Sequence, residues 1–104
     1  MTLERVKQVI LVPRWLGMQP GKIASQCCWA AVLFGVRASK RIILRVDTPE
    51  QLEDLIYAAK SVDLTVEQVV DEGLTEVPPN SITAISIVGE ESVVDTVTGG
   101  LPLL

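Results

Sequence analysis

The sequence predicts an α/β fold: a single domain, residues 1–104, whose mixed four-stranded β-sheet is flanked by helices on both faces. The length of 104 residues is that of one domain. Short apolar runs and helical patterns follow one another in the order β-α-β-α-β-β-α, which implies right-handed crossovers and partly parallel pairing. The third and fourth strands follow closely enough to pair antiparallel. Together these observations favour a mixed sheet.

Four short runs rich in β-branched residues predict the strands. The first, "KQVILVP" at residues 7–13, is an apolar run of the kind buried in the middle of a sheet, and it ends at a proline. The other three predicted strands are residues 41–46, 64–70 and 81–88.

The first predicted helix is the segment "GKIASQCCWAAVLFG", residues 21–35. Its apolar residues recur every three or four positions, as the buried side of a helix requires. They are Ile23, Cys27, Ala30, Ala31 and Phe34. Because neighbouring residues on a helix point about 100° apart, we expect Cys27 to pack inward and Trp29 to lie on the same side as Lys22 and Gln26.

Residues 47–61 have clear signals for the start of a second helix. Thr48 suits the N-cap, Pro49 the first helical position, and Gln51 completes a capping box. Its buried stripe is expected to be Leu52, Leu55, Ile56 and Ala59. A short final helix, residues 91–99, has a glycine near its end.

The composition excludes several classes of site. The chain has no histidine, which removes Ser-His and Cys-His nucleophilic catalysis. Its two cysteines, Cys27 and Cys28, are adjacent, so no CxxC spacing exists, and we expect neither a metal nor a cofactor. No apolar run approaches the length of a membrane span, and residues 1–14 carry charges where a signal peptide would need its apolar core. We therefore expect a cytoplasmic protein without a membrane partner.

The charge distribution and the apolar content each suggest a kind of binding partner. The net charge is −4, but residues 1–45 carry eight basic side chains against Glu4 alone, whereas residues 46–104 carry Lys60 against twelve acidic ones. A basic first half could supply a phosphate-binding surface, or the two halves could simply neutralise one another. The chain is 48% apolar, which is high for so small a domain and suggests a buried oligomer contact.

The segment "DEGLTEVPPNS", residues 71–81, is predicted to be a surface loop that follows a strand. In open sheets with helical crossovers, sites form beyond strand ends and at helix N-termini. Lys22 opens the first helix, so it could face Asp71 across such a cleft. Ordinary turn chemistry is the alternative interpretation of these polar residues.

The same loop carries a family resemblance. "DEGLTEVPPNSITAISIVG" and "VDTVTGGLPLL" resemble the C-terminal half of the type-II peptidyl-tRNA hydrolases, which reads D-A-G-x-T-x-x-x-P-G-[ST]-x-T and ends in V-T-G-x-L-x-L-L. "KQVILV" and "GKIASQCCWAA" resemble the family's opening strand and its G-K-x-A-x-Q-x-x-H-A helix. The resemblance covers nearly the whole chain. It implies a mixed four-stranded sheet, usually a homodimer, and hydrolysis of the ester that joins a peptide to tRNA.

Carried over position by position, the resemblance assigns catalytic roles to Lys22, Asp71 and Thr75. The substrate-binding candidates are Gln26, Trp29 and Arg14. This chain departs from the family pattern at several places. Trp29 replaces a histidine, Gln19-Pro20 replaces a glycine-lysine pair, Glu72 replaces an alanine, and residues 35–40 form a shorter connection than the family's.

Two functions stay open at this stage. The first is hydrolysis of peptidyl-tRNA, in which Lys22 stabilises an anion at the helix N-terminus and Asp71 orients or deprotonates a water. The second is a non-catalytic relative of the same fold that binds RNA or protein. Trp29 could stack on a base or ribose, pack beneath the loop around Thr75, or lie in a dimer contact.

Overall fold

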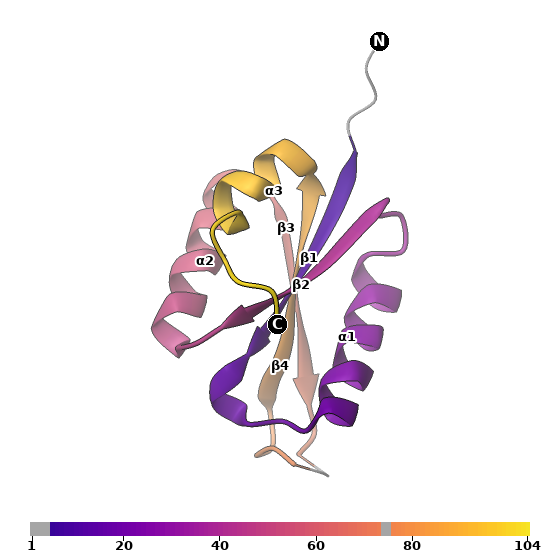
Figure 1. Ribbon diagram of the computed structural model, residues 1–104, viewed down its shortest axis with the longest axis vertical. Helices are drawn as coiled ribbons and strands as arrows, with labels where there is room; N and C mark the ends of the chain where they lie inside the picture. The colour runs from indigo at the N-terminus through magenta and orange to yellow at the C-terminus, as the bar shows by residue number, and fades with distance from the viewer. Residues whose placement is uncertain (1–4, 74–75) are drawn as a thin grey trace.

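The computed structural model describes residues 5–73 and 76–104 of the chain. Its four strands form one sheet in the order β2-β1-β4-β3 (Figure 1). β1 pairs in parallel with β2 and antiparallel with β4, and β4 pairs antiparallel with β3. The prediction of a mixed four-stranded sheet is confirmed. The strands are β1 (Val6–Pro13), β2 (Lys40–Val46), β3 (Thr65–Asp71) and β4 (Ser81–Glu90).

Helices cover both faces of this sheet. α1 (Pro20–Phe34) lies on one face, and α2 (Pro49–Ser61) and α3 (Glu91–Thr98) lie on the other (Figure 1). A short 3₁₀ helix that the sequence did not predict, η1 (Arg14–Leu16), follows β1. Gly17 ends it in the left-handed conformation, with φ at 62°, which glycine adopts without steric cost.

The two faces of the sheet carry two separate hydrophobic cores, because side chains alternate along β1. Ile10 and Val12 face α1, whereas Val9 and Leu11 face α2 and α3. The predicted apolar stripes of α1 and α2 both pack into these cores. Cys27 is buried and Cys28 is exposed, as the helical spacing predicts.

The start of α2 differs in one detail from the predicted capping box. Thr48 Oγ1 accepts a hydrogen bond from the Gln51 amide at 3.1 Å, as expected. The side chain of Gln51 instead reaches one residue further back and accepts from the Asp47 amide at 2.9 Å. The helix N-terminus is therefore capped from both directions, and Pro49 occupies the first turn.

The connection between α1 and β2 is short, and a buried polar cluster closes it. Gln8 donates from Nε2 to Ala30 O at 3.1 Å and to Ser86 Oγ at 2.8 Å, and its Oε1 accepts from Arg41 Nε at 3.0 Å. A Cβ at Gly35 would overlap the Gln8 amide, so only glycine lets the chain turn this close to the sheet.

The β3–β4 pair contains an irregularity that matters for the site. Val69 pairs with Ala84 but the next residue, Val70, pairs with Ile82, so Thr83 is an extra residue in β4. Such a β-bulge re-aims a side chain. β3 also continues to Asp71, which pairs with Ser81 and is therefore the last residue of the strand, not the first residue of the loop as predicted.

None of the helices within residues 5–73 and 76–104 is both long enough and apolar enough to cross a membrane.

Candidate active site

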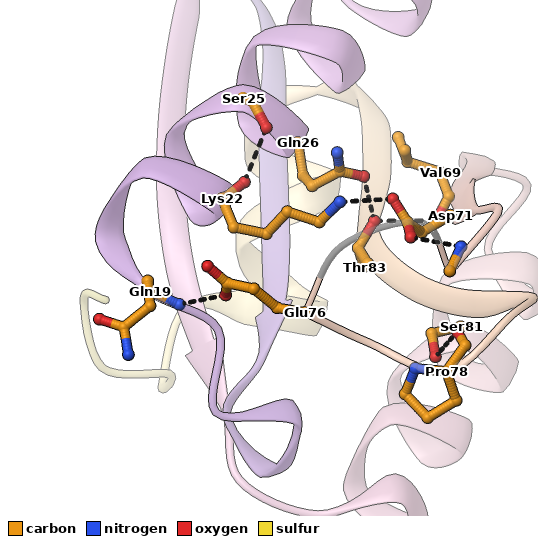
Figure 2. A network of polar contacts seen from close by, with 11 residues as sticks. Gln19, Lys22, Ser25, Gln26, Val69, Asp71, Glu76, Pro78, Ser81 and Thr83 are labelled. Atoms are coloured by element: carbon orange, nitrogen blue, oxygen red, sulfur yellow. Dashed lines mark hydrogen bonds and ion pairs between the residues drawn. The ribbon is translucent and has the colours of Figure 1, made fainter.

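A partly buried ion pair joins the first turn of α1 to the end of β3. Lys22 Nζ lies 2.5 Å from Asp71 Oδ1, and the two side chains are only 10% and 12% exposed (Figure 2). Lys22 lies in the first turn because Pro20 is the first residue of α1. The structure therefore brings together two of the three residues predicted to be catalytic.

The second carboxylate oxygen of Asp71 is fixed by the backbone of the following turn. Asp71 Oδ2 accepts a hydrogen bond from the Gly73 amide at 2.7 Å. Gly73 has a φ of 81°, and a Cβ there would overlap the backbone of Pro79. The glycine of the D-x-G motif is thus required by the turn that presents its amide to Asp71.

These contacts lower the pKa of Asp71 below its ordinary value. The hydrogen bond from Lys22 contributes most, the Gly73 amide contributes next, and partial desolvation opposes them. Asp71 is therefore ionised throughout the neutral range. A carboxylate with a lowered pKa accepts protons weakly, so it is better suited to holding a cation or a water than to removing a proton.

Gln26 lies one turn after Lys22 and is held by β4. Its Oε1 accepts a short hydrogen bond from the hydroxyl of Thr83, which also lies 3.4 Å from Val69 O. Gln26 and Thr83 are both buried. The bulge in β4 turns Thr83 toward α1, where it fixes the amide of Gln26 beside the ion pair (Figure 2).

The sequence interpretation missed Thr83. The signal for it was present, because Thr83 stands at the final threonine of the family's D-A-G motif. The direction of the Thr83 side chain was not predictable. In a regular strand Thr83 and Ala84 would lie on opposite faces of the sheet, so only one of them could face α1.

The loop after β3 is tied to the start of α1 by Glu76. The backbone amide of Gln19, the N-cap residue, donates to Glu76 Oε2 at 2.7 Å (Figure 2). The sequence predicted that this helix N-terminus would attract an anion of the substrate. In the structure the chain's own carboxylate takes the Gln19 amide, so an anion of the substrate has to use Lys22 or another donor.

Trp29 borders an open hollow beside Gln26. The hollow is about 460 Å³ and is also lined by Ser25, Cys28 and Val32. The indole is 55% exposed, so it does not pack beneath the loop, which was one of the three alternatives. It lies on the outer side of α1 and is free to contact another molecule.

Two predicted site residues remain, Arg14 and Thr75. Arg14 lies away from the ion pair, and Thr75 lies outside the described residues. Arg14 belongs to η1, pairs with Asp47 at 3.6 Å, and lines a different hollow together with Met18 and Ile23. Thr75 lies outside the described residues, so its catalytic role remains a prediction. Within residues 5–73 and 76–104, no group of three or more Cys, Asp or Glu side chains could hold a metal ion.

Fold and site together define a small α/β protein with a partly buried ammonium–carboxylate pair at one end of an open sheet. The sequence model of the family described as "Peptidyl-tRNA hydrolase PTH2" matches residues 34–104, which include Asp71 and Thr83. Peptidyl-tRNA hydrolases from Staphylothermus marinus and Methanopyrus kandleri are each 35% identical over 94% of this chain, and the matches cover 94% and 97% of those proteins. The chain belongs to the peptidyl-tRNA hydrolase PTH2 family.

Two further comparisons place the chain within its fold and family. A protein of unknown function from Agrobacterium tumefaciens has a TM-score of 0.61 and 11% identity, with 98% of this chain and 99% of that one covered, so the likeness extends to the fold alone. The alignment with the Staphylothermus marinus protein spans 114 residues, more than the 104 of this chain. That relative therefore carries residues that this compact member lacks.

Proposed function

We propose that this protein hydrolyses the ester bond between peptide and tRNA in peptidyl-tRNA, which frees the tRNA for reuse. The observation that carries the proposal is the Lys22–Asp71 pair, partly buried and 2.5 Å apart, in a chain whose similar proteins are named peptidyl-tRNA hydrolases. Ester hydrolysis needs a polarised carbonyl and a positioned water, and this pair can supply both.

Lys22 is the electrostatic stabiliser in this proposal. Its ammonium group has three donors, and one of them serves Asp71. The other two are available to the carbonyl oxygen of the ester, which becomes negatively charged as water adds. A donor that is already fixed by Asp71 needs no reorganisation at that moment, which is the basis of this kind of catalysis.

Asp71 orients the attacking water, with Thr75 as its partner. Because the pKa of Asp71 is lowered by Lys22 and the Gly73 amide, the carboxylate is a weak base, but its remaining lone pairs accept hydrogen bonds from water. The hydroxyl of Thr75 would hold the same water or the substrate. Gln26, whose Oε1 accepts from Thr83, would donate its amide N–H groups to the substrate.

Trp29 and Arg14 are proposed to bind the tRNA. The exposed indole of Trp29 borders the hollow beside Gln26, where it can stack on a base of the single-stranded 3′ end. Arg14 is largely exposed on η1 and suits a phosphate contact. Since peptidyl-tRNA arises during translation, we further propose that the protein acts in the cytoplasm.

Self-association is also proposed. Three further apolar side chains are exposed near the end of α1. Val32 and Leu33 belong to the helix, and Val36 follows it. Val32 and Leu33 lie on the part of α1 that is turned away from the sheet, Val36 follows just after the helix, and a helix that is apolar all round is normally covered. A second copy packed on these side chains would form a homodimer.

The direct test is release of peptide from a synthetic peptidyl-tRNA by the purified protein. Hydrolysis is expected, with Trp29→Ala weakening tRNA binding about tenfold through the loss of stacking. Tyr57→Ala is the matched control, because Tyr57 is an exposed aromatic on α2. Tight tRNA binding without any release would overturn the proposal in favour of a non-catalytic RNA-binding relative.

A further inference from the structure

A second hollow lies on the opposite face of the sheet from α1. It is about 350 Å³ and opens between η1, the first turns of α2 and the beginning of β4. Its walls are mostly apolar, from Trp15, Leu52, Ile56 and Ile82. This volume is within the range of sites that hold small molecules or single side chains.

Trp15 is held at the rim of this hollow by the local backbone. η1 presents the side chain, and Gly17 in its left-handed conformation ends η1 immediately afterwards. Trp15 is 40% exposed, whereas Leu52, which lines the same hollow, is 7% exposed. The hollow therefore offers an exposed aromatic side chain next to a buried apolar one.

The hollow is close to the catalytic pair through β4. Asn80 and Ser81 form part of its wall. Ser81 pairs with Asp71 across the sheet, and the Asn80 amide donates to Asp71 O at 2.8 Å. A substrate held at Asp71 can thus extend around the end of the sheet toward Trp15.

The charge of the lining decides which half of the substrate fits. Among the described residues that line the hollow, Glu53 alone is charged, and no lining residue is basic. A phosphate would be repelled here, because it needs cationic partners. The peptide half of peptidyl-tRNA is free of phosphate and carries apolar side chains.

We propose that this hollow is a peptide subsite, which holds an apolar or aromatic side chain that precedes the esterified residue. The inference rests on the proposed function and names a specificity element for it. Trp15 supplies the contact face, and Leu52 and Ile56 supply apolar walls.

The test compares two substrates that share one tRNA and one esterified residue. One has phenylalanine and the other glycine at the two preceding positions. The wild-type protein is expected to show a KM about tenfold lower for the phenylalanine substrate, since a hydrophobic contact discriminates by about this factor or more. Trp15→Ala should lose the preference by raising KM at unchanged kcat, which is the signature of lost ground-state binding.

Controls separate this subsite from folding defects. Tyr57→Ala, which removes an aromatic elsewhere on α2, should keep the preference, and Trp15→Phe should retain part of it. An equal preference in Trp15→Ala and the wild type would overturn the subsite, as would no preference in the wild type.

A titration that needs no activity separates the subsite from the proposed function. A capped Phe-Phe peptide amide is added to the ¹⁵N-labelled protein, and the two indole N–H signals are assigned by the loss of one in Trp15→Phe. A shift of the Trp15 signal supports the subsite even if hydrolysis fails. A shift of Trp29 alone, no shift, or a shift of Trp15 with deacylated tRNA instead would overturn it.

Discussion

Both carboxylate oxygens of Asp71 accept a hydrogen bond, one from Lys22 and the other from the Gly73 amide. These contacts make the stability of the folded protein depend on pH. Lys22 and the Gly73 amide lower the pKa of Asp71, so the ionised form stabilises the folded state above the pKa of the unfolded chain. That contribution is lost as the pH falls through the lowered pKa. Binding, not proton removal, is the function that such a carboxylate performs well.

We therefore expect the stability difference between the wild type and Asp71→Asn to be full at pH 7 and to shrink below about pH 4. Urea unfolding at pH 7, 5 and 3 measures it. Asp54→Asn, at an exposed position of α2, is the control. A difference that stays constant from pH 7 to pH 3 would show that Asp71 is not held as an ion.

Thr83 gives the second prediction at this scale. Thr83→Val removes the hydroxyl that fixes Gln26, and a buried acceptor left without its donor costs about 1–3 kcal/mol of stability. Turnover should fall by up to about 100-fold as Gln26 loses its position.

Thr83→Ser restores the hydroxyl and should recover turnover, while Thr96→Val, on the exposed side of α3, should change little. Wild-type turnover in a folded Thr83→Val protein would mean that Gln26 needs no support from β4.

How much of the site was predictable differs from residue to residue. The proximity of Lys22 and Asp71 followed from a helix start and a strand end, which open α/β sheets bring together. The direction of Thr83 did not, because a β-bulge depends on the pairing of two strands and has no signature within one. The use of the Gln19 amide by Glu76 depends in the same way on a contact between segments 57 residues apart.

At the scale of elements, the loop between β3 and β4 depends on two residues with positive φ. Gly73 has a φ of 81°, and Asn80, where the family motif has glycine, has a φ of 66°. Asparagine tolerates this conformation better than most residues do, which explains why the replacement is accepted. The Asn80 amide donates to Asp71 O, and Ser81 pairs with Asp71.

Gly73→Ala should destabilise the protein by about 1–3 kcal/mol, because the left-handed backbone is strained with a Cβ and the added atom meets Pro79. Activity should fall as well, since the Gly73 amide holds Asp71. Thermal unfolding and peptide release measure the two effects. Gly100→Ala, where an added Cβ meets nothing within 4 Å, should be nearly neutral. Equal effects of the two substitutions would contradict this account.

Most elements were predictable because local signals agreed with the final packing. The apolar stripes of α1 and α2, Thr48 at its cap and the four strands all follow from periodicity and capping rules. η1 was missed because three residues are too few to show a period. The capping box differed from the prediction because the side chain of Gln51 bonds to the Asp47 amide and not to the next one, that of Thr48.

For the whole molecule, the unusual feature is a group of exposed apolar side chains at the end of α1 and just after it. Val32, Leu33 and Val36 are all more than half exposed. If a second copy covers them, the double substitution Leu33→Glu and Val36→Glu should yield a monomer near 11.3 kDa. Light scattering from micromolar to millimolar concentration measures the mass, with Tyr57→Glu as the control. A wild-type protein that stays monomeric throughout would rule out this dimer.

The measurement that tests the central claim most directly is a double-mutant cycle on peptide release. Lys22→Ala and Asp71→Asn should each lower kcat/KM by about 10²–10³, the usual cost of losing one electrostatic stabiliser. Because the two residues act as one unit, the double variant should be no slower than the slower single variant. Full turnover in either folded single variant, or losses that multiply in the double variant, would contradict the account.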